Sequence, residues 1–132
     1  MQAGAERFHA LPEGVTDLVD WLANDELRSI KAEPTLAYYQ DLQQALIECH
    51  RVMKPGGVAC WVVGKESVFY TFKTRKVLRR VPCDLLFVQI AEYAGFEVAE
   101  TLDIELQKRN LNARPRSKDP YFETAVLLKK RG

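Results

Sequence analysis

The residues with the clearest chemical character lie between positions 65 and 80. Cations bind phosphates and aromatic rings stack on unpaired bases, so a mixture of the two is typical of a nucleic-acid-binding surface. The alternative is a solvated loop whose aromatic side chains fold back onto the core. The basic residues are Lys65, Lys73, Arg75, Lys76, Arg79 and Arg80, and the aromatic residues among them are Phe69, Tyr70 and Phe72.

A second basic stretch supports the same interpretation. Residues 108–119 form a polar segment interrupted by Pro115, and we take Arg114 and Arg116 as further candidate nucleic-acid-binding residues. The charge of the chain is also uneven: residues 1–64 hold 5 basic against 9 acidic residues, and residues 65–132 hold 14 against 9. An anionic partner for the second half is one explanation, and an ordinary solvated surface is the other.

Other reactive side chains do not form a recognisable site. Cys49, Cys60 and Cys83 are odd in number and lack paired metal-ligand spacing, so we expect buried free thiols. His50 falls in the last turn of an expected helix, where positive charge complements the helix dipole. We therefore assign no metal ligand and no catalytic residue.

Composition is that of a single folded domain. The chain has 132 residues, of which 47% are apolar and 28% charged, enough for a core of its own. It contains no apolar run of the roughly 20 residues that cross a membrane and no signal-peptide pattern, so we expect a cytoplasmic protein without membrane contact. Residues 1–14 are predicted to be a flexible arm and residues 15–132 the folded domain.

The first half of the chain predicts two helices followed by a turn and a strand. Thr16 is the expected N-cap of a helix that ends near Leu27. A longer helix is expected to begin at Glu33-Pro34, with its apolar stripe at Tyr38, Leu42, Ala45, Leu46, Cys49 and Met53. The turn Lys54-Pro55-Gly56-Gly57 then leads into Val58–Val63, which lacks polar alternation and is predicted to be a strand covered by helices on both faces.

The second half predicts one helix and two strands. The helix opens at Pro82-Cys83-Asp84 and stops at Gly95. Alternating apolar residues over 96–106 predict a long, half-exposed strand with a bulge near Glu100. Residues 121–129 are apolar on both faces, so this last strand should lie inside the sheet.

This order of elements resembles the C-terminal half of class I S-adenosylmethionine-dependent methyltransferases. The resemblance covers residues 15–131 and is greatest to site-specific DNA amino-methyltransferases and related RNA methylases. It implies an α/β, partial Rossmann-like methyltransferase fold: a small mixed sheet of about three strands, the last antiparallel between the others, with flanking helices. It rests on Tyr38-Tyr39-Gln40-Asp41-Leu42, Cys49 to Gly57, Val62-Val63-Gly64, Ala94-Gly95-Phe96-Glu97 and Tyr121 to Lys129.

The chain also departs from that family. Members bind S-adenosylmethionine with a glycine-rich turn after their first strand and present the target amine to a loop containing two prolines and an aromatic residue. Neither motif occurs here; Asp119-Pro120-Tyr121 has one proline too few and precedes the terminal strand. The resemblance thus implies S-adenosylmethionine as the family cofactor, with no cofactor bound by this chain alone.

The chain also lacks a strand that the family's sheet contains, and two kinds of partner could supply it. In the family's sheet, another strand lies beside the one that corresponds to Val58–Val63, so this apolar edge should be covered. We expect either a homodimer through the edge or a missing N-terminal half. Three functions follow: part of a DNA or RNA methyltransferase, a non-catalytic nucleic-acid-binding or oligomeric interaction module, or a remnant without activity of its own.

Overall fold

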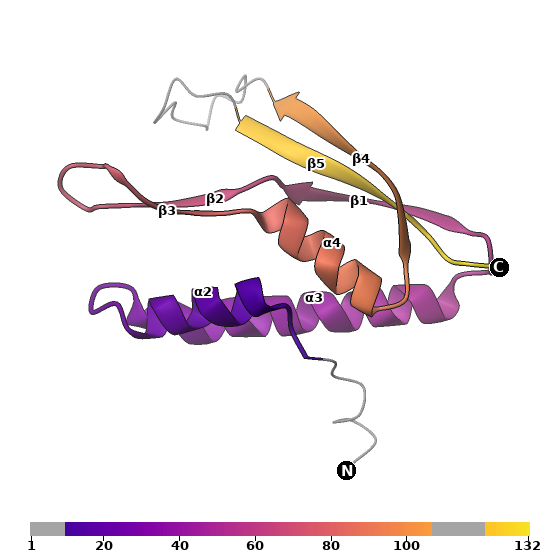
Figure 1. Ribbon diagram of the computed structural model, residues 1–132, viewed down its shortest axis with the longest axis horizontal. Helices are drawn as coiled ribbons and strands as arrows, with labels where there is room; N and C mark the ends of the chain where they lie inside the picture. The colour runs from indigo at the N-terminus through magenta and orange to yellow at the C-terminus, as the bar shows by residue number, and fades with distance from the viewer. Residues whose placement is uncertain (1–9, 107–120) are drawn as a thin grey trace, which may run out of the picture.

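The computed structural model describes residues 10–106 and 121–132 and shows an α/β fold in two layers (Figure 1). One layer is a three-stranded sheet in the order β1-β5-β4, and the described helices lie below it in the view of Figure 1. A two-stranded hairpin, β2–β3, extends sideways from the sheet. The elements are α2 Glu13–Ala23, a 3-10 turn η1 Ser29–Lys31, α3 Ala32–Val52, β1 Val58–Gly64, β2 Ser67–Tyr70, β3 Val77–Val81, α4 Cys83–Tyr93, β4 Glu97–Leu106 and β5 Tyr121–Lys129.

The first helix begins earlier than its sequence predicts. Helix α2 starts at Glu13, so Thr16 is not its N-cap. The Thr16 hydroxyl instead donates to the Glu13 carbonyl at 2.9 Å, inside the first turn. Pro12, which suits a helix start, precedes the helix and is fully buried. Residues 1–9 of the expected arm lie outside the described residues.

The same helix ends at Ala23 and does not continue to Leu27. The Asp25 carboxylate accepts the backbone N–H groups of Leu27 and Arg28 at 2.9 and 3.2 Å. This local turn satisfies backbone groups that helix continuation would otherwise use, and so competes with the helix.

Helix α3 is confirmed, but its buried face is rotated from the predicted stripe. Tyr39, Gln43 and Leu46 are buried, whereas Tyr38 is 59% exposed and Ala45 is exposed. Helices α2 and α4 both pack on α3, and they cover the face next to the predicted stripe. Part of an apolar stripe is thereby left without cover from the described residues.

The turn between α3 and β1 has the predicted chemistry. Gly56 adopts a φ of +82°, a conformation that glycine accepts and other residues resist. The N–H of Gly56 donates to the Lys130 carbonyl at 2.7 Å, which ties the turn to the end of β5. The Lys130 ammonium also donates to the carbonyls of His50 and Met53 at 2.7 and 2.9 Å, so it caps the C-terminus of α3.

The sheet topology is confirmed. Strand β5 lies antiparallel between β1 and β4, as the resemblance implied. The predicted bulge is present in β4, where the register shifts between Val98 and Glu100. Beneath the sheet, the ring of Phe87 in α4 lies 5.6 Å from the ring of Trp61 in β1. The core therefore forms between the inner face of the sheet and the helices.

The prediction that helices cover both faces of β1 was wrong. Val58 and Val62 are 60% and 55% exposed and Cys60 is also exposed, because the described helices cover only the face that carries Trp61. The expectation that all three cysteines are buried fails for the same reason at Cys60, whereas Cys49 and Cys83 are half-buried. On this outer face, β4 adds exposed Leu102 to the apolar side chains of β1.

We predicted no strand within residues 65–80, but Ser67–Tyr70 and Val77–Val81 form the hairpin β2–β3. Val68 pairs with Arg80 and Phe69 with Arg79, with a register shift between Phe69 and Tyr70. Basic residues interrupt the apolar alternation that normally marks a strand, and this concealed β3 in the sequence. None of the helices in residues 10–106 and 121–132 is both long and apolar enough to cross a membrane.

Candidate nucleic-acid interface

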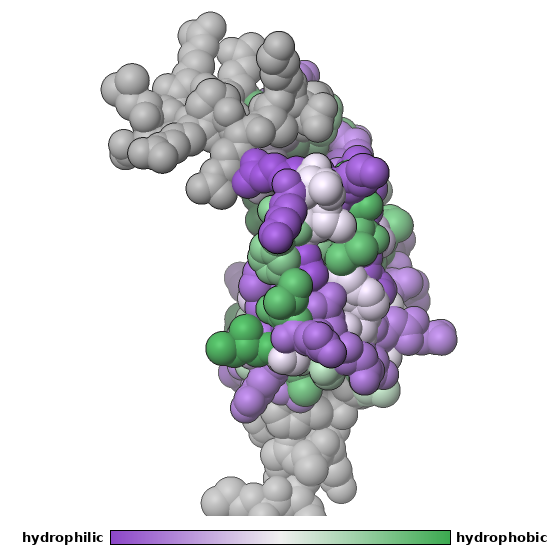
Figure 2. Space-filling model, turned by 90° about the vertical axis from the view of Figure 1, so that its left-hand side faces the viewer, coloured by the Kyte–Doolittle hydropathy of each residue, from purple (hydrophilic) through white to green (hydrophobic). Residues whose placement is uncertain are grey.

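The tip of the β2–β3 hairpin gathers three of the predicted basic residues. Lys73, Arg75 and Lys76 are all exposed there. The described part of the chain gives none of the three an ion-pair partner. Figure 2 looks toward this end of the molecule and shows purple hydrophilic residues interspersed with green hydrophobic ones. The tip therefore presents positive charge that an external anion can reach.

Threonine hydroxyls hold the tip in shape. The hydroxyls of Thr71 and Thr74 lie 2.6 Å apart, and the Lys76 N–H donates to the Thr71 hydroxyl at 3.0 Å. The backbone N–H of Thr71 donates to the Lys76 carbonyl at 2.9 Å. Arg75 adopts a left-handed φ of +53°, which lets the chain reverse within a few residues.

The other three predicted cations on the hairpin have intramolecular partners. Lys65 pairs with Asp103, and this hydrogen bond to the carboxylate raises the pKa of Lys65. Arg80 lies 2.8 Å from a Glu66 carboxylate oxygen, and the Arg79 guanidinium lies 5.2 Å from the centre of the Trp21 ring. The six cations thus divide into three at the tip and three at the base of the hairpin. A phosphate has easier access to the first set.

The aromatic residues divide in the same way. Phe69 folds back, with its ring 5.3 Å from that of Trp21 in an edge-on contact, as the solvated-loop alternative expects. Phe72 is 66% exposed, and the guanidinium of Arg28 covers one side of its ring at 4.5 Å. Arg28 was missed because its role depends on folding: it is buried, lies 3.1 Å from Asp25 and donates to the Tyr70 carbonyl. Arg28 therefore links the segment after α2 to the hairpin.

Two predicted residues cannot be placed beside this tip. Arg114 and Arg116 lie outside the described residues, as does the rest of the basic stretch 108–118. Whether they share a surface with Lys73, Arg75 and Lys76 stays a prediction. Tyr121, the last residue of the Asp119-Pro120-Tyr121 run, is the first residue of β5.

A cavity of about 460 Å³ lies at the base of the hairpin, between α3 and the end of β1. Its walls include Tyr38, Leu42, Val63, Phe69 and Phe87. A volume of this size is within the usual range for small-molecule pockets. No pattern in the sequence predicted the cavity, because residues from helices, strands and the hairpin combine to form it.

Three polar side chains meet on one wall of the cavity. The Cys83 sulfur lies 4.0 Å from the Tyr39 hydroxyl and 3.4 Å from the Ser67 hydroxyl. Burial is the largest cause that raises the pKa of Tyr39, and the neighbouring Cys83 raises it further. The phenol therefore stays neutral. Glu66 also lines the cavity, but its carboxylate pairs with Arg80. Within the group the Tyr39 hydroxyl donates to Cys83 and the Cys83 thiol donates to Ser67, so the Ser67 hydroxyl is the member placed to donate to a bound molecule.

The described glycines with positive φ lie at the ends of helices. A glycine-rich cofactor turn must follow a strand, at the carboxyl edge of the sheet. The two described glycines with positive φ, Gly56 and Gly95, instead follow helices and precede β1 and β4. Gly64 ends β1 and lines the cavity, but Lys65 and Glu66 follow it. Within the described ranges there is also no group of three or more potential metal ligands.

The fold defined by these elements is a partial methyltransferase fold. No protein-family model matches the chain, and no curated protein matches it in sequence. Among solved structures, a protein assigned as a DNA modification methylase from Thermus thermophilus matches with a TM-score of 0.57 at 18% identity, over 76% of this chain and 39% of that one. A structure of the same protein complexed with S-adenosyl-L-methionine matches with a TM-score of 0.55 at 18% identity, over 80% and 40%.

These likenesses establish the fold of the chain. The predicted methyltransferase-like architecture is confirmed, and the chain spans about two fifths of the length of the methylase it matches. At 18% identity, similarity of backbone does not carry activity from one protein to the other.

Proposed function

We propose that this chain is the nucleic-acid-contacting part of an S-adenosylmethionine-dependent DNA or RNA methyltransferase. Cofactor and catalytic groups would come from a polypeptide segment outside these 132 residues. The likeness in fold to a methylase supports the proposal, and the match spans only part of that methylase. The observation that carries it is the exposed hairpin tip with Lys73, Arg75 and Lys76.

The tip has the features that backbone contact requires. Its cations would neutralise phosphates, which supplies affinity without sequence preference. Phe72 offers a ring face for a base, and Arg28 fixes the orientation of that ring. Because the base of the hairpin is tied to β4 through Lys65 and Asp103, a bound strand would be held at a set distance from the sheet.

The first prediction concerns these three cations. Changing Lys73, Arg75 and Lys76 together to Ala should weaken binding roughly 10- to 100-fold at low salt and reduce the salt dependence by about 3 in the log–log slope. Fluorescence anisotropy with a labelled DNA duplex and a labelled single-stranded RNA measures both quantities and distinguishes the two nucleic acids.

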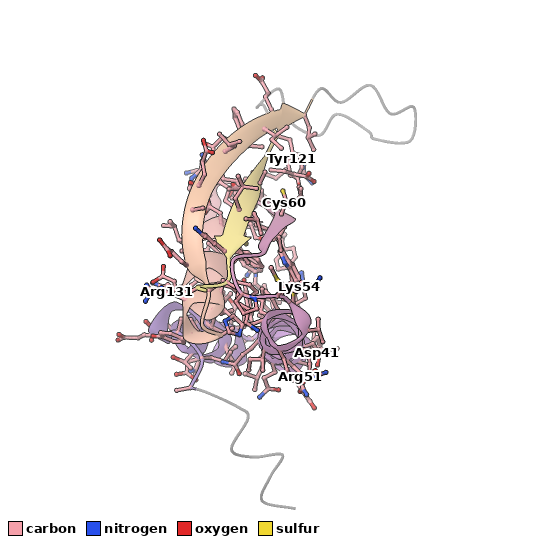
Figure 3. All side chains as sticks on the ribbon, turned by 90° about the vertical axis from the view of Figure 1, so that its right-hand side faces the viewer. Asp41, Arg51, Lys54, Cys60, Tyr121 and Arg131 are labelled. Carbon is pink, nitrogen blue, oxygen red and sulfur yellow. The ribbon has the colours of Figure 1, made fainter. Side chains whose placement is uncertain are left out.

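A matched control removes the same charge elsewhere. Lys54 lies in the turn between α3 and β1, Lys129 ends β5 and Arg131 follows it, and all three are exposed. This end of the molecule lies opposite the hairpin in Figure 1, and Figure 3 looks at it with Lys54 and Arg131 labelled. Changing all three to Ala should leave most of the affinity. Equal losses in the two triple variants would show that binding follows net charge alone, and the hairpin would have no special role.

The second prediction concerns the cofactor. Titration calorimetry of the isolated chain with S-adenosylmethionine should give no binding heat, because the described glycines do not form the required turn. Binding at micromolar concentration would contradict this and place a cofactor site in the chain itself.

The alternative is a non-catalytic nucleic-acid-binding or interaction module. The Tyr39, Cys83 and Ser67 group favours it, because linked hydroxyl and thiol groups in a cavity suit hydrogen bonding to a bound molecule. The two functions differ in what a partner adds. A methyltransferase part would gain S-adenosylmethionine binding on assembly, and a free-standing module would not. A cytoplasmic location and a homodimer through β1 stay predictions of the sequence.

A further inference from the structure

The cavity at the base of the hairpin has walls that the fold itself holds in place. The ring of Phe69 lies 5.3 Å from that of Trp21, and the rings of Tyr38 and Tyr39 meet edge-on at 5.1 Å. Phe87, on another wall, is 1% exposed. Because contacts outside the cavity fix these rings, the space between them is largely pre-formed, as in sites that bind small molecules.

The shape of the cavity suits a compact molecule better than an extended chain. It borders β1 only at Val63 and Gly64, the last two residues of that strand. Most of its other walls come from η1, α3, α4 and the hairpin. A polypeptide that pairs with a sheet edge needs a row of strand residues, which the cavity does not border. Its volume of about 460 Å³ is enough for a small organic molecule.

Lys31 gives the cavity a positive charge that its own walls do not match. The charged side chains among the lining residues are Lys31 and Glu66. The Glu66 carboxylate lies 2.8 Å from the Arg80 guanidinium, so its charge is already paired. Lys31 has no ion pair within residues 10–106 and 121–132, and its ammonium lies 6.0 Å from the centre of the Phe69 ring. The cavity should therefore favour an anion.

A chain of hydrogen bonds along the wall ends in one hydroxyl proton that a ligand can accept. The Tyr39 hydroxyl donates to the Cys83 sulfur, and the Cys83 thiol donates to the Ser67 oxygen. The Ser67 hydroxyl keeps its own proton for a further acceptor. Ser67 and Phe69 are two residues apart in β2, so their side chains share one face of the strand. The donor therefore lies beside the ring that Lys31 approaches.

The remaining wall is mostly aliphatic. Leu18, Leu42, Val63 and Val81 contribute to it from four different elements. The hydroxyl groups of a sugar would lose their hydration against such side chains without gaining hydrogen bonds, whereas an aromatic ring loses little. A ligand with a flat apolar body is therefore a better fit than a nucleotide.

We propose that this cavity binds an aromatic carboxylic acid with a hydrogen-bond acceptor on its ring system. The ring lies between the aromatic walls, the carboxylate faces Lys31, and the acceptor takes the proton of Ser67. The proposal goes beyond the proposed function and does not depend on it, because this ligand is neither a nucleic acid nor S-adenosylmethionine.

The third prediction uses hydroxynaphthoate, with its two substituents on opposite rings, as the probe. Titration into the isotope-labelled full chain should shift the amide signals of Gly64, Ser67 and Phe69 and give a Kd. At about ten times that Kd, the probe should slow alkylation of Cys83 by N-ethylmaleimide about tenfold by mass action. Cys60 is exposed and does not line the cavity, so its alkylation in the same sample should not change. Mass spectrometry of the digested chain separates the two cysteines.

Two variants that remove one positive charge test the carboxylate contact. Lys31→Gln should weaken hydroxynaphthoate binding about 3- to 5-fold, as expected for an exposed ion pair. It should leave binding of the neutral hydroxynaphthamide unchanged. Lys54→Gln removes the same charge in the turn between α3 and β1 and should affect neither ligand. Both side chains are exposed, so neither variant should unfold the chain.

Two further variants test the donor and the space. Ser67→Ala should weaken both ligands about 3- to 10-fold, because it removes a neutral hydrogen bond. Gly64→Leu should abolish binding of both by filling the cavity that Gly64 lines. An added β-carbon at Gly64 would lie 3.7 Å from the Tyr121 hydroxyl, an ordinary contact, so the strand can accept a side chain there.

Several outcomes would overturn the proposal. Equal weakening by Lys31→Gln and Lys54→Gln would show that the carboxylate is not recognised at Lys31. Octanoate binding as tightly as the probe would assign the cavity to an aliphatic acid, and equal protection of Cys83 by adenosine monophosphate would assign it to a nucleotide. Unchanged amide signals and unprotected Cys83 would show that the cavity does not bind the probe. All these readouts use the chain without nucleic acid, so the proposed function is tested separately by the hairpin variants.

Discussion

Replacing Phe87 with alanine should lower the free energy of unfolding by about 3–5 kcal/mol, the usual cost of removing a buried aromatic ring. Phe87 is 1% exposed and its ring contacts that of Trp61. It joins α4 to the inner face of β1 and also borders the cavity. The surrounding groups cannot close the space fully, because the existing cavity lies on one side of it. Urea unfolding followed by circular dichroism measures the loss.

Leu85 in the same helix provides the comparison. Its side chain is 59% exposed, so Leu85→Ala changes helix propensity little and removes few packing contacts. It should cost less than about 1 kcal/mol. If Phe87→Ala were as mild as Leu85→Ala, the inner face of β1 would not be the core of this domain.

The sequence was most informative where local chemistry decides the structure. The turn at Gly56, the helix stop at Gly95 and the bulge near Glu100 were all predicted, because each depends on neighbouring residues. The central position of β5 also followed from its apolar faces. Residues that are close in sequence carried the information in each case.

Burial was less predictable than secondary structure. Periodicity marked Tyr38 and Ala45 on α3 and both faces of β1 as apolar, but it could not say what covers them. Among the described residues, α2 and α4 pack on the adjacent face of α3, and α4 packs on the inner face of the sheet. The outer face of β1 and part of the apolar stripe of α3 are therefore exposed.

The basic residues of the candidate interface could be predicted from the sequence, but their partners could not. The composition of residues 65–80 indicated cations with aromatic rings, and three of those cations are exposed at the tip. The partners that remove the other three, Asp103, Glu66 and Trp21, are known only from the fold. The contacts of Arg28 with the hairpin and the walls of the cavity likewise join residues that are far apart in sequence. No local pattern predicts them.

Replacing Gly95 with alanine should cost about 2–4 kcal/mol, because two penalties combine there. Gly95 has a φ of +105°, which strains any residue with a β-carbon. That added carbon would also stand 3.0 Å from Nε2 of His50. The His50 ring is held edge-on against Phe96, with ring centres 5.0 Å apart, so it cannot easily move aside.

Gly56 separates these two penalties. It has a φ of +82°, but an added β-carbon there meets nothing within 4 Å. Gly56→Ala should therefore cost only the backbone term, about 1–2 kcal/mol. In a His50→Ala background, the cost of Gly95→Ala should fall toward that value, and a double-mutant cycle by urea unfolding measures the difference. An unchanged cost would mean that the His50 ring yields and that backbone strain alone makes glycine necessary at this helix end.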